Sequence, residues 1–176
     1  MPETGPSIPQ PFLPVAGGDG GGGGGRVLPI VLHPDPVLRK RCAPAGDLTH
    51  AETRQLVRDL LATMYAAGGR GLAAPQLGVL RRVFVMDAGW KDGAPVPLAL
   101  LDPEILACSD AREAAVERCL SIPDQPVSVS RPLTVEIGWY DLDGAHHRRL
   151  LTGAEARIAQ HEADHLDGRL ILDVPE

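Results

Sequence analysis

The 176-residue chain is poor in aromatic side chains, in net positive charge and in long apolar runs. Aromatic residues make up only 3% of it, so Leu, Val, Ile and Ala must supply the packing of a core. Its formal net charge of −6 argues against a nucleic-acid or anionic-membrane surface, because such surfaces need clustered Lys and Arg. It also lacks a segment long and apolar enough to cross a bilayer, and a secretory signal. We therefore expect a cytoplasmic protein that binds neither nucleic acid nor membrane.

Cysteine is scarce as well. Cys42, Cys108 and Cys119 are an odd number, and they are too few for a disulfide-stabilised fold. The sequence therefore favours a reducing compartment, in which at least one thiol is free for other chemistry.

Two regions differ in composition. Residues 1–25 are rich in Pro and end in consecutive glycines, so they have too little apolar surface to offset the entropy of ordering. We expect a flexible leader over 1–25 and a single folded domain over 26–176. A domain of that size buries a substantial core without disulfides.

Two segments have the pattern of helices. The first spans about 51–66, where apolar residues recur at helical spacing and two glycines follow as a stop. The second spans about 153–166, where Thr152 is a good N-cap and Glu155 completes a capping-box pattern.

Apolar, β-branched runs predict strands over 82–87, 97–106, 112–117, 133–140 and 146–151. Residues 141–144 have the composition of a hairpin turn between the last two strands. The predicted fold is α+β, with mostly antiparallel strands around a central helix that carries a metal-binding motif, and an amphipathic helix in the N-terminal half.

The central predicted helix carries the motif His-Glu-Ala-Asp-His at residues 161–165. On a helix, residues four apart share a face, so His161 and His165 can hold one metal ion. Glu162 then stands beside that ion, where a carboxylate can carry protons. This pattern favours a hydrolytic metal site.

Three segments stand out together, Gly69–Gln76, Glu117–Ser121 and Gln160–Gly168. In order and residue types they resemble the three signature motifs of the peptide deformylases, enzymes that remove the formyl group from N-formylmethionine at the start of new bacterial proteins. The resemblance extends over residues 26–174. It implies a hydrolase that acts on N-formylmethionyl nascent peptides and releases formate.

The resemblance and the side-chain chemistry give the same metal ligands, Cys119, His161 and His165. Two imidazoles and a thiolate leave a tetrahedral divalent ion one open position for water, as a catalytic site requires. Such an ion lowers the pKa of bound water from about 15.7 toward 7, and Glu162 would pass the water proton to the departing amine. The ligands suit Fe(II), Zn(II), Co(II) or Ni(II), and the resemblance implies Fe(II).

The resemblance also implies two donors for the formyl oxygen. These are the side-chain amide of Gln76 and the backbone N–H of Leu120, and Gly71 would line the approach of the substrate. One such donor contributes about 3 kcal/mol in the transition state.

Acidic residues usually orient metal-bound imidazoles. Glu117 and Asp164 are the acidic candidates here, and Arg131, placed as a recurring family arginine is, would pair with one of them.

Two positions depart from the family pattern. Arg118 stands where the family has the Gly of Glu-Gly-Cys-Leu-Ser, and Arg70 stands where a medium-sized apolar residue is usual. If the backbone at 118 requires positive φ, an arginine there costs about 1 kcal/mol or more. We hypothesise that Arg70 and Arg118, with Arg157 as a third charge at the rim, narrow or recharge the substrate groove. The alternative is a near-neutral change at an exposed rim.

Two other functions share some of these features. A general metallopeptidase uses the same His-Glu-x-x-His motif, but its third ligand is normally a later His or Glu, and no His follows His165. A catalytically weak or specialised paralogue would bind formyl-peptides or deformylase inhibitors without useful turnover.

The C-terminus is a third departure, since many family members continue well beyond the metal-binding helix and this chain stops at Glu176. Because this extension is missing, the sequence gives no support for a ribosome contact made through it.

Overall fold

The computed structural model describes residues 24–47 and 50–174. The predicted leader over 1–25 lies outside this part of the chain except for its last two glycines. Helix α1 spans His50–Ala66 and helix α2 spans Gly153–Leu166. The strands are β1 (Gly71–Ala73), β2 (Val83–Met86), β3 (Leu98–Cys108), β4 (Arg112–Cys119), β5 (Ile122–Pro132), β6 (Thr134–Tyr140) and β7 (His146–Thr152).

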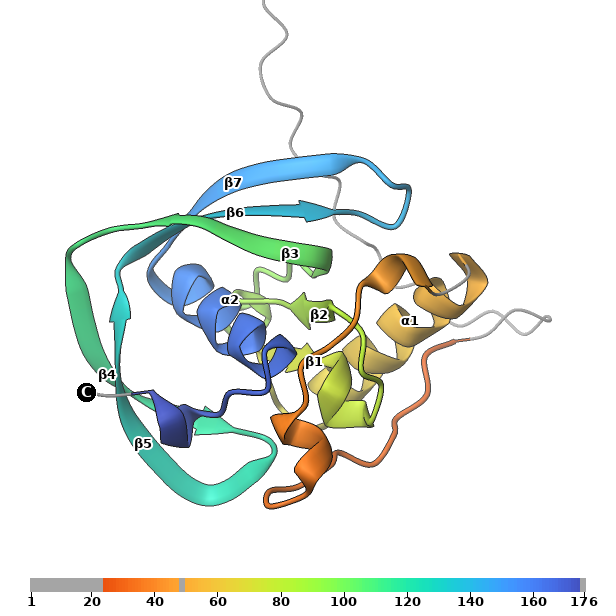
Figure 1. Ribbon diagram of the computed structural model, residues 1–176, viewed down its shortest axis with the longest axis horizontal. Coiled ribbons are helices and arrows are strands. Elements are labelled where there is room, and N and C mark those ends of the chain that lie inside the picture. The colour runs from red at the N-terminus through yellow and green to blue at the C-terminus, as the bar shows by residue number, and fades with distance from the viewer. Residues whose placement is uncertain (1–23, 48–49, 175–176) are drawn as a thin grey trace, which may run out of the picture.

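The strands form two antiparallel sheets. One sheet has five strands in the order β1-β2-β3-β6-β7, and the other is the β4-β5 hairpin. Helix α2 lies in the centre of the molecule, where it contacts strands of both sheets (Figure 1). The predicted α+β class with mostly antiparallel strands is confirmed.

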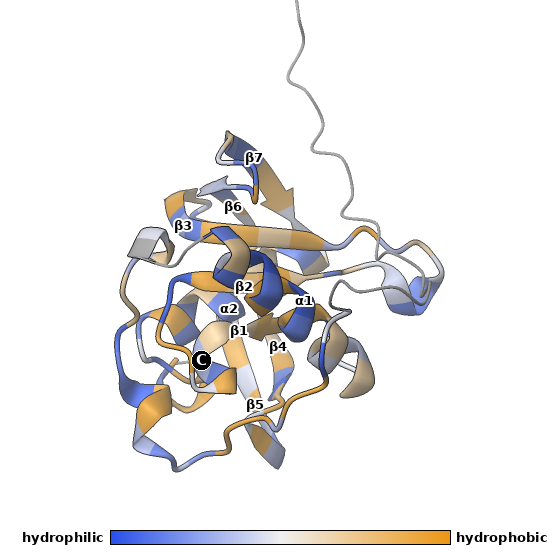
Figure 2. Ribbon diagram, turned by 90° about the vertical axis from the view of Figure 1, so that its right-hand side faces the viewer, coloured by the Kyte–Doolittle hydropathy of each residue, from blue (hydrophilic) through white to orange (hydrophobic). Residues whose placement is uncertain are grey.

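Strand β2 is buried on both faces, which explains its unbroken apolar sequence Val-Phe-Val-Met. Because side chains alternate along a strand, Val83 and Val85 pack with α1, whereas Phe84 and Met86 pack with α2. The two helices therefore cover opposite faces of the same strand. Figure 2 shows that apolar residues predominate on the strand segments in the interior.

Small residues let α2 lie at the centre. Ala156 and Ala159 are fully buried, and they pack in the same cluster as Val135 and Ile137 of β6. A bulky side chain at either position would push the helix away from the sheet, because interiors are close-packed.

Both predicted helices are present, but the predicted capping box at α2 is wrong. Thr152 is the N-cap residue, yet its side chain makes no capping hydrogen bond. The Glu155 carboxylate instead accepts a hydrogen bond of 2.5 Å from Arg149. Gly168, with φ of +72°, follows the end of the helix, as a left-handed glycine commonly does.

All five predicted strands are present, and the 141–144 turn joins β6 to β7. Asp141 holds this turn, because its Oδ1 accepts hydrogen bonds from the N–H groups of Asp143 and Ala145, each at 2.9 Å. No described helix combines the length and apolar character that crossing a membrane requires.

Two strands were not predicted. Strand β1 has only three residues, and β5 contains Pro123, Pro126 and Pro132, which argue against a strand in the sequence. The hairpin tolerates them because β5 pairs on one side only, with β4.

Candidate active site

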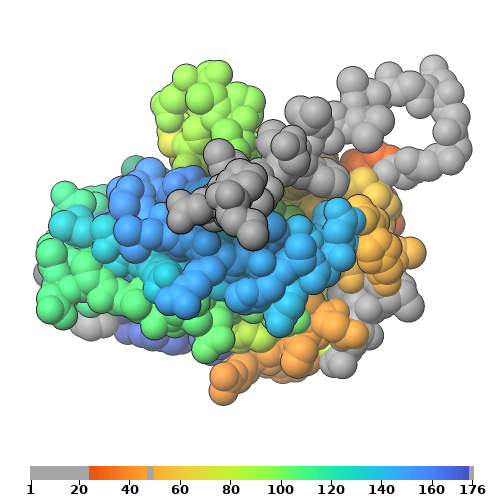
Figure 3. Space-filling view, turned by 90° about the horizontal axis from the view of Figure 1, so that it is seen from above, coloured from red at the N-terminus to blue at the C-terminus, as the bar shows by residue number. Residues whose placement is uncertain are grey.

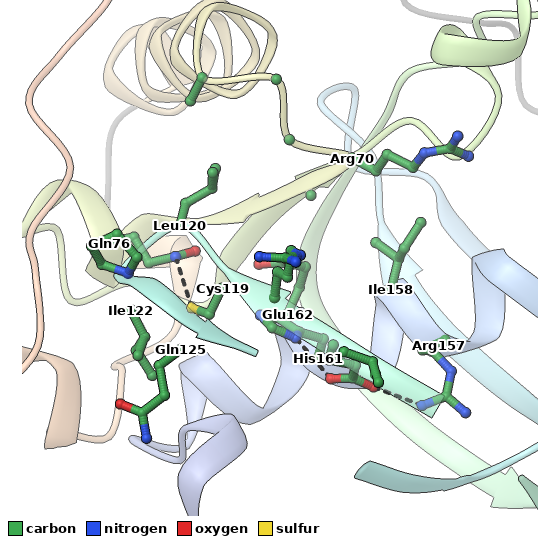
Figure 4. Close-up of a pocket in the computed structure, with 18 of the residues that line it drawn as sticks. Arg70, Gln76, Cys119, Leu120, Ile122, Gln125, Arg157, Ile158, His161 and Glu162 are labelled. Carbon is green, nitrogen blue, oxygen red and sulfur yellow. Dashed lines mark hydrogen bonds and ion pairs between the residues drawn. The ribbon is translucent and has the colours of Figure 1, made fainter. Parts of the chain in front are cut away.

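Three donor side chains from two elements meet at one point. Cys119 ends β4, while His161 and His165 lie one turn apart on α2. Their ligand atoms all lie within 4.8 Å of one another, and Cys119 Sγ is 3.4 Å from His165 Nε2. Bonds of about 2.0–2.3 Å to a tetrahedral ion place its ligand atoms roughly 3.3–3.8 Å apart. The ligand atoms therefore need to move only slightly closer together to bind a divalent metal through two nitrogens and one sulfur. Figure 4 shows part of this cluster.

Glu117 is the centre of a buried charge network. Its Oε1 accepts a hydrogen bond of 2.6 Å from Arg131 Nε and one of 2.9 Å from Arg157 Nη1. Its Oε2 lies 3.0 Å from His161 Nδ1, which leaves the other ring nitrogen of His161 to face the cluster. Arg131 also donates to Asp164 Oδ2 at 2.9 Å, so it pairs with both predicted acidic partners and not with one.

The network fixes the charge of its members. Burial alone would raise the pKa of Glu117, but its hydrogen bonds with His161 and Arg131 lower that pKa to about 2. Burial alone would lower the pKa of His161, but hydrogen bonds with Cys119 and Glu117 raise it to about 10. Burial, and then the charges of His161 and Arg131, lower the pKa of His165 well below its usual range. The surroundings therefore favour positive charge at His161 and a neutral imidazole, the form that binds a metal, at His165.

Glu162 lies beside the cluster and is 4% exposed. Burial raises the pKa of its carboxyl to about 7, and its Oε2 has no hydrogen-bond partner within residues 24–47 and 50–174. A carboxyl group with such a pKa can take up and release a proton at neutral pH.

Gly71 lies directly against Glu162. A Cβ at position 71 would lie 2.3 Å from Glu162 Oε1 and 2.8 Å from its Cδ. The glycine is therefore needed to accommodate the glutamate, in addition to the role at the substrate approach that the sequence suggested.

The side chain of Gln76 has a fixed orientation. Its Oε1 accepts a hydrogen bond of 2.9 Å from Ala73 N, and its Nε2 donates to Ser121 Oγ at 3.1 Å. The same Nε2 lies 3.8 Å from Cys119 Sγ, so its second hydrogen faces the donor cluster, as Figure 4 shows. Sequence reasoning did not single out Ser121, although this buried hydroxyl helps to orient the amide.

A pocket of about 690 Å³ opens beside the cluster. Its walls come from the Gly69–Gly71 segment, from the end of β4 with Leu120, and from Arg157 and Ile158 of α2. His161 and Glu162 also line it, so a ligand in the pocket would reach the donor cluster.

Two of the three arginines at the pocket are held by the protein itself. Arg70 donates to the carbonyl oxygen of Ala88 and forms an ion pair of 3.1 Å with Asp92. Figure 4 shows its guanidinium pointing away from Cys119 and His161. Arg157 is bound to Glu117, to the carbonyl oxygen of Val129 at 3.0 Å and to that of Glu113 at 2.8 Å.

Arg118 has a different environment. Positive φ occurs at only two non-glycine residues in the described part of the chain, Asp102 and Asp124, so the backbone at Arg118 is unstrained. The side chain is exposed and lines the pocket, and β4 has a register shift at this point, between Glu117 and Cys119. The arginine therefore adds an exposed, charged side chain to the pocket lining without a positive φ in the backbone beside Cys119.

An aromatic contact that was not predicted from the sequence supports the edge of the pocket. Trp90 Nε1 donates to the carbonyl oxygen of Gly69 at 2.8 Å, and its ring packs edge-on against Tyr65, with ring centroids 5.3 Å apart. The scarcity of aromatic residues was the available signal, since the chain has only two Trp and two Tyr.

A cysteine and two imidazoles beside a buried glutamic acid, at the end of an open pocket, form the arrangement of a metal-dependent hydrolase. Comparison with known proteins defines it further. The family model described as polypeptide deformylase matches residues 27–175. The peptide deformylase of Mesorhizobium japonicum is 42% identical over 147 residues, which are 84% of this chain and 83% of that protein.

Solved structures agree with this match. A peptide deformylase from Thermotoga maritima has a TM-score of 0.79 and 38% identity, covering 86% of this chain and 99% of that one. A class I type b peptide deformylase from Acinetobacter baumannii, bound to Met-Ala-Ser, has a TM-score of 0.79 and 32% identity, covering 85% of this chain and 99% of that one. The chain belongs to the polypeptide deformylase family.

Proposed function

We propose that this protein removes the formyl group from N-formylmethionyl peptides of newly made proteins and releases formate. The observation that carries the proposal is the cluster of Cys119, His161 and His165 beside the buried Glu162, at the end of a pocket open to a peptide. Cys119, His161 and His165 would hold one divalent metal ion. When bound, that ion supplies Lewis-acid chemistry to the hydrolysis.

Glu162 moves the proton in this scheme. Its carboxylate accepts a proton from the water that attacks the formyl carbon, and Oε2 is the oxygen free to do so. When the carbon–nitrogen bond breaks, the same carboxyl delivers that proton to the amine nitrogen of methionine. Water thus supplies the hydroxyl of formic acid and the hydrogen of the new amine.

Gln76 and Leu120 stabilise the negative charge that develops on the formyl oxygen. The Gln76 amide is suited to this because Ala73 and Ser121 hold it with one Nε2 hydrogen toward the cluster. The backbone N–H of Leu120, the residue after Cys119, is the second donor. Donors that are already oriented need no rearrangement as the charge forms.

Glu117, Arg131 and Asp164 keep the metal ligands in place. The contact of Glu117 with His161 Nδ1 fixes the orientation of that imidazole, and Arg131 holds Glu117 and Asp164 together. Gly71 leaves room for Glu162, and Arg70 fixes the segment between β2 and β3 against the pocket edge.

We propose Fe(II) as the resident ion, with Zn(II), Co(II) and Ni(II) as the ions that the same ligands accept. Action on nascent chains places the protein in the cytoplasm. Among the described residues the donor set contains a thiolate, so no observation favours the general metallopeptidase, whose third ligand is a His or Glu.

Formate release from N-formyl-Met-Ala-Ser by protein prepared anaerobically with Fe(II) tests the proposal. We expect turnover in the native protein and its loss in Glu162→Ala, whose metal content should be unchanged because Glu162 is not a ligand. Absence of formate from fully metallated native protein would refute the activity and leave a binding-only paralogue. Cleavage of unformylated peptides would point to the metallopeptidase.

A further inference from the structure

The pocket contains two cations that the protein does not neutralise. Among the described residues, Arg118 forms no ion pair, and neither does Lys91, whose ammonium lies 5.6 Å from the centre of the Trp90 ring. Both line the pocket. They differ in this from Arg70 and Arg157, whose guanidinium groups are already bound to carboxylates.

The acidic residues of the pocket cancel only part of this charge. Glu117 is buried and shared among Arg131, Arg157 and His161, so its charge is already balanced. Glu162 is buried beside the donor cluster, where only 4% of the residue is exposed. Asp124 is an exposed carboxylate of the lining and makes no ion pair within the described residues, so it offsets one of the two positive charges. One positive charge therefore remains in excess among these exposed groups.

The two free cations come from different segments. Arg118 belongs to β4, directly before Cys119, and Lys91 belongs to the segment between β2 and β3. That segment, lime green in Figure 3, projects from the body of the molecule. A peptide whose formyl group reaches the cluster would occupy the pocket that both side chains line. A guanidinium offers paired N–H donors that match a carboxylate.

We propose that Arg118, assisted by Lys91, binds a side-chain carboxylate of the peptide soon after its formylmethionine. The site therefore favours N-formylmethionyl chains with Asp or Glu at the second or third residue. This inference rests on the proposed deformylase function and adds a substrate preference to it. The arginine at a position where the family has glycine is then a specificity determinant.

The test uses C-terminally amidated peptides, so that the side chain provides the only carboxylate. N-formyl-Met-X-Ser-Ala-amide and N-formyl-Met-Ala-X-Ala-amide, with X as Asp, Asn or Lys, are compared by kcat/KM at low and high salt. An exposed ion pair changes affinity by up to about fivefold. We expect about fivefold preference for Asp over Asn at one of the two positions, roughly tenfold for Asp over Lys, and loss of both in high salt.

Variants assign the preference to Arg118. Arg118→Gln should reduce the Asp-to-Asn ratio to about one, and Arg118→Lys should retain part of it because the charge remains. Lys40→Gln removes an exposed cation that does not line the pocket, and the ratio should stay at the native value. A native ratio near one, or a ratio that Arg118→Gln leaves unchanged, would overturn the inference.

A binding measurement separates this inference from the proposed function. Calorimetry measures Kd without any turnover. The ligands are the deformylated peptides Met-Asp-Ser-Ala-amide and Met-Asn-Ser-Ala-amide, and the corresponding pair with Asp or Asn at the third residue. Tighter binding of an Asp peptide by native protein, but not by Arg118→Gln, supports the inference even if no formate is released. Equal Kd values overturn it, even if the neutral formyl-peptide is hydrolysed well.

Discussion

The α-carbon of Gly71 lies so close to the Glu162 carboxylate that a Cβ would come within 2.3 Å of Oε1. The contact joins the edge strand β1 to the central helix α2 at the point where the proposed proton transfer takes place. The position of the Glu162 carboxylate thus depends on the absence of a side chain at Gly71, which belongs to a different sequence motif.

Gly71→Ala should therefore impair catalysis more than folding. The flexible end of Glu162 can move away from the new methyl group, but a shift of about 1 Å in a catalytic group costs on the order of a hundredfold in rate. Formate release should fall by that order, while the thermal midpoint changes little. Gly46→Ala is the matched control, because a Cβ at 46 meets no atom of the described residues within 4 Å. Unchanged kcat in Gly71→Ala would show that the proposed role of Glu162 does not depend on this contact.

Replacing Gln76 with Ala removes an oriented donor. Loss of one such donor is worth about 3 kcal/mol in the transition state, so kcat should fall roughly a hundredfold. The effect should appear in kcat more than in KM, because the charge on the formyl oxygen develops only during the reaction. Gln55→Ala, on α1, is the control. A change confined to KM would assign Gln76 to substrate binding instead.

Glu117→Gln should weaken the metal site. Its carboxylate contacts His161 Nδ1 and is held by Arg131, and loss of such a partner typically reduces metal affinity by about 10–100-fold. Competition with a chelator of known affinity measures the Kd for Zn(II) in native protein and variant. Glu136→Gln, at the exposed ion pair with Arg148, should leave the Kd unchanged. Equal metal affinity in Glu117→Gln and native protein would remove the positioning role.

Stability should depend on pH through Asp59, which lies on α1. Burial would raise the pKa of its carboxyl, but hydrogen bonds from Arg26 and Gln55 lower it below the usual 3.8. A lowered folded-state pKa stabilises the fold above the unfolded pKa, and this contribution is lost as the pH falls through the folded value. Because Arg26 is 66% exposed, we expect only about 1 kcal/mol.

Urea unfolding of native protein and Asp59→Asn measures this contribution. The difference in the free energy of unfolding should be near 1 kcal/mol at pH 7 and should shrink progressively below about pH 4. A difference that stays constant between pH 7 and pH 3 would mean that the charge of Asp59 is not its source.

Sequence patterns predicted the elements whose signals are local. The apolar periodicity of α1 and α2 and the β-branched runs gave both helices and five strands. Strand β5 was missed because its prolines argue against a strand, and only pairing with β4 overrides that local preference. The capping box failed because Arg149, across the start of α2, competes for the Glu155 carboxylate.

The predictions for the site also divide into local features, which the sequence indicates, and tertiary contacts, which it does not. The spacing of His161 and His165 on one helix is a local property, so the sequence predicted their proximity. The contact of Gly71 with Glu162, and the network that joins Glu117 to two arginines, are tertiary contacts that no spacing encodes. The roles of Arg70, Arg118 and Arg157 also could not be distinguished from the sequence, because they depend on which guanidinium groups form ion pairs within the protein.

An anaerobic titration of metal-free protein with Fe(II) tests the central claim most directly, with formate release and bound iron measured on the same samples. We predict that the rate rises in proportion to bound iron and levels off at one ion per chain, and that Cys119→Ala and His165→Ala lose both iron and activity. Full activity without a bound ion, or unchanged iron binding in these two variants, would contradict the account.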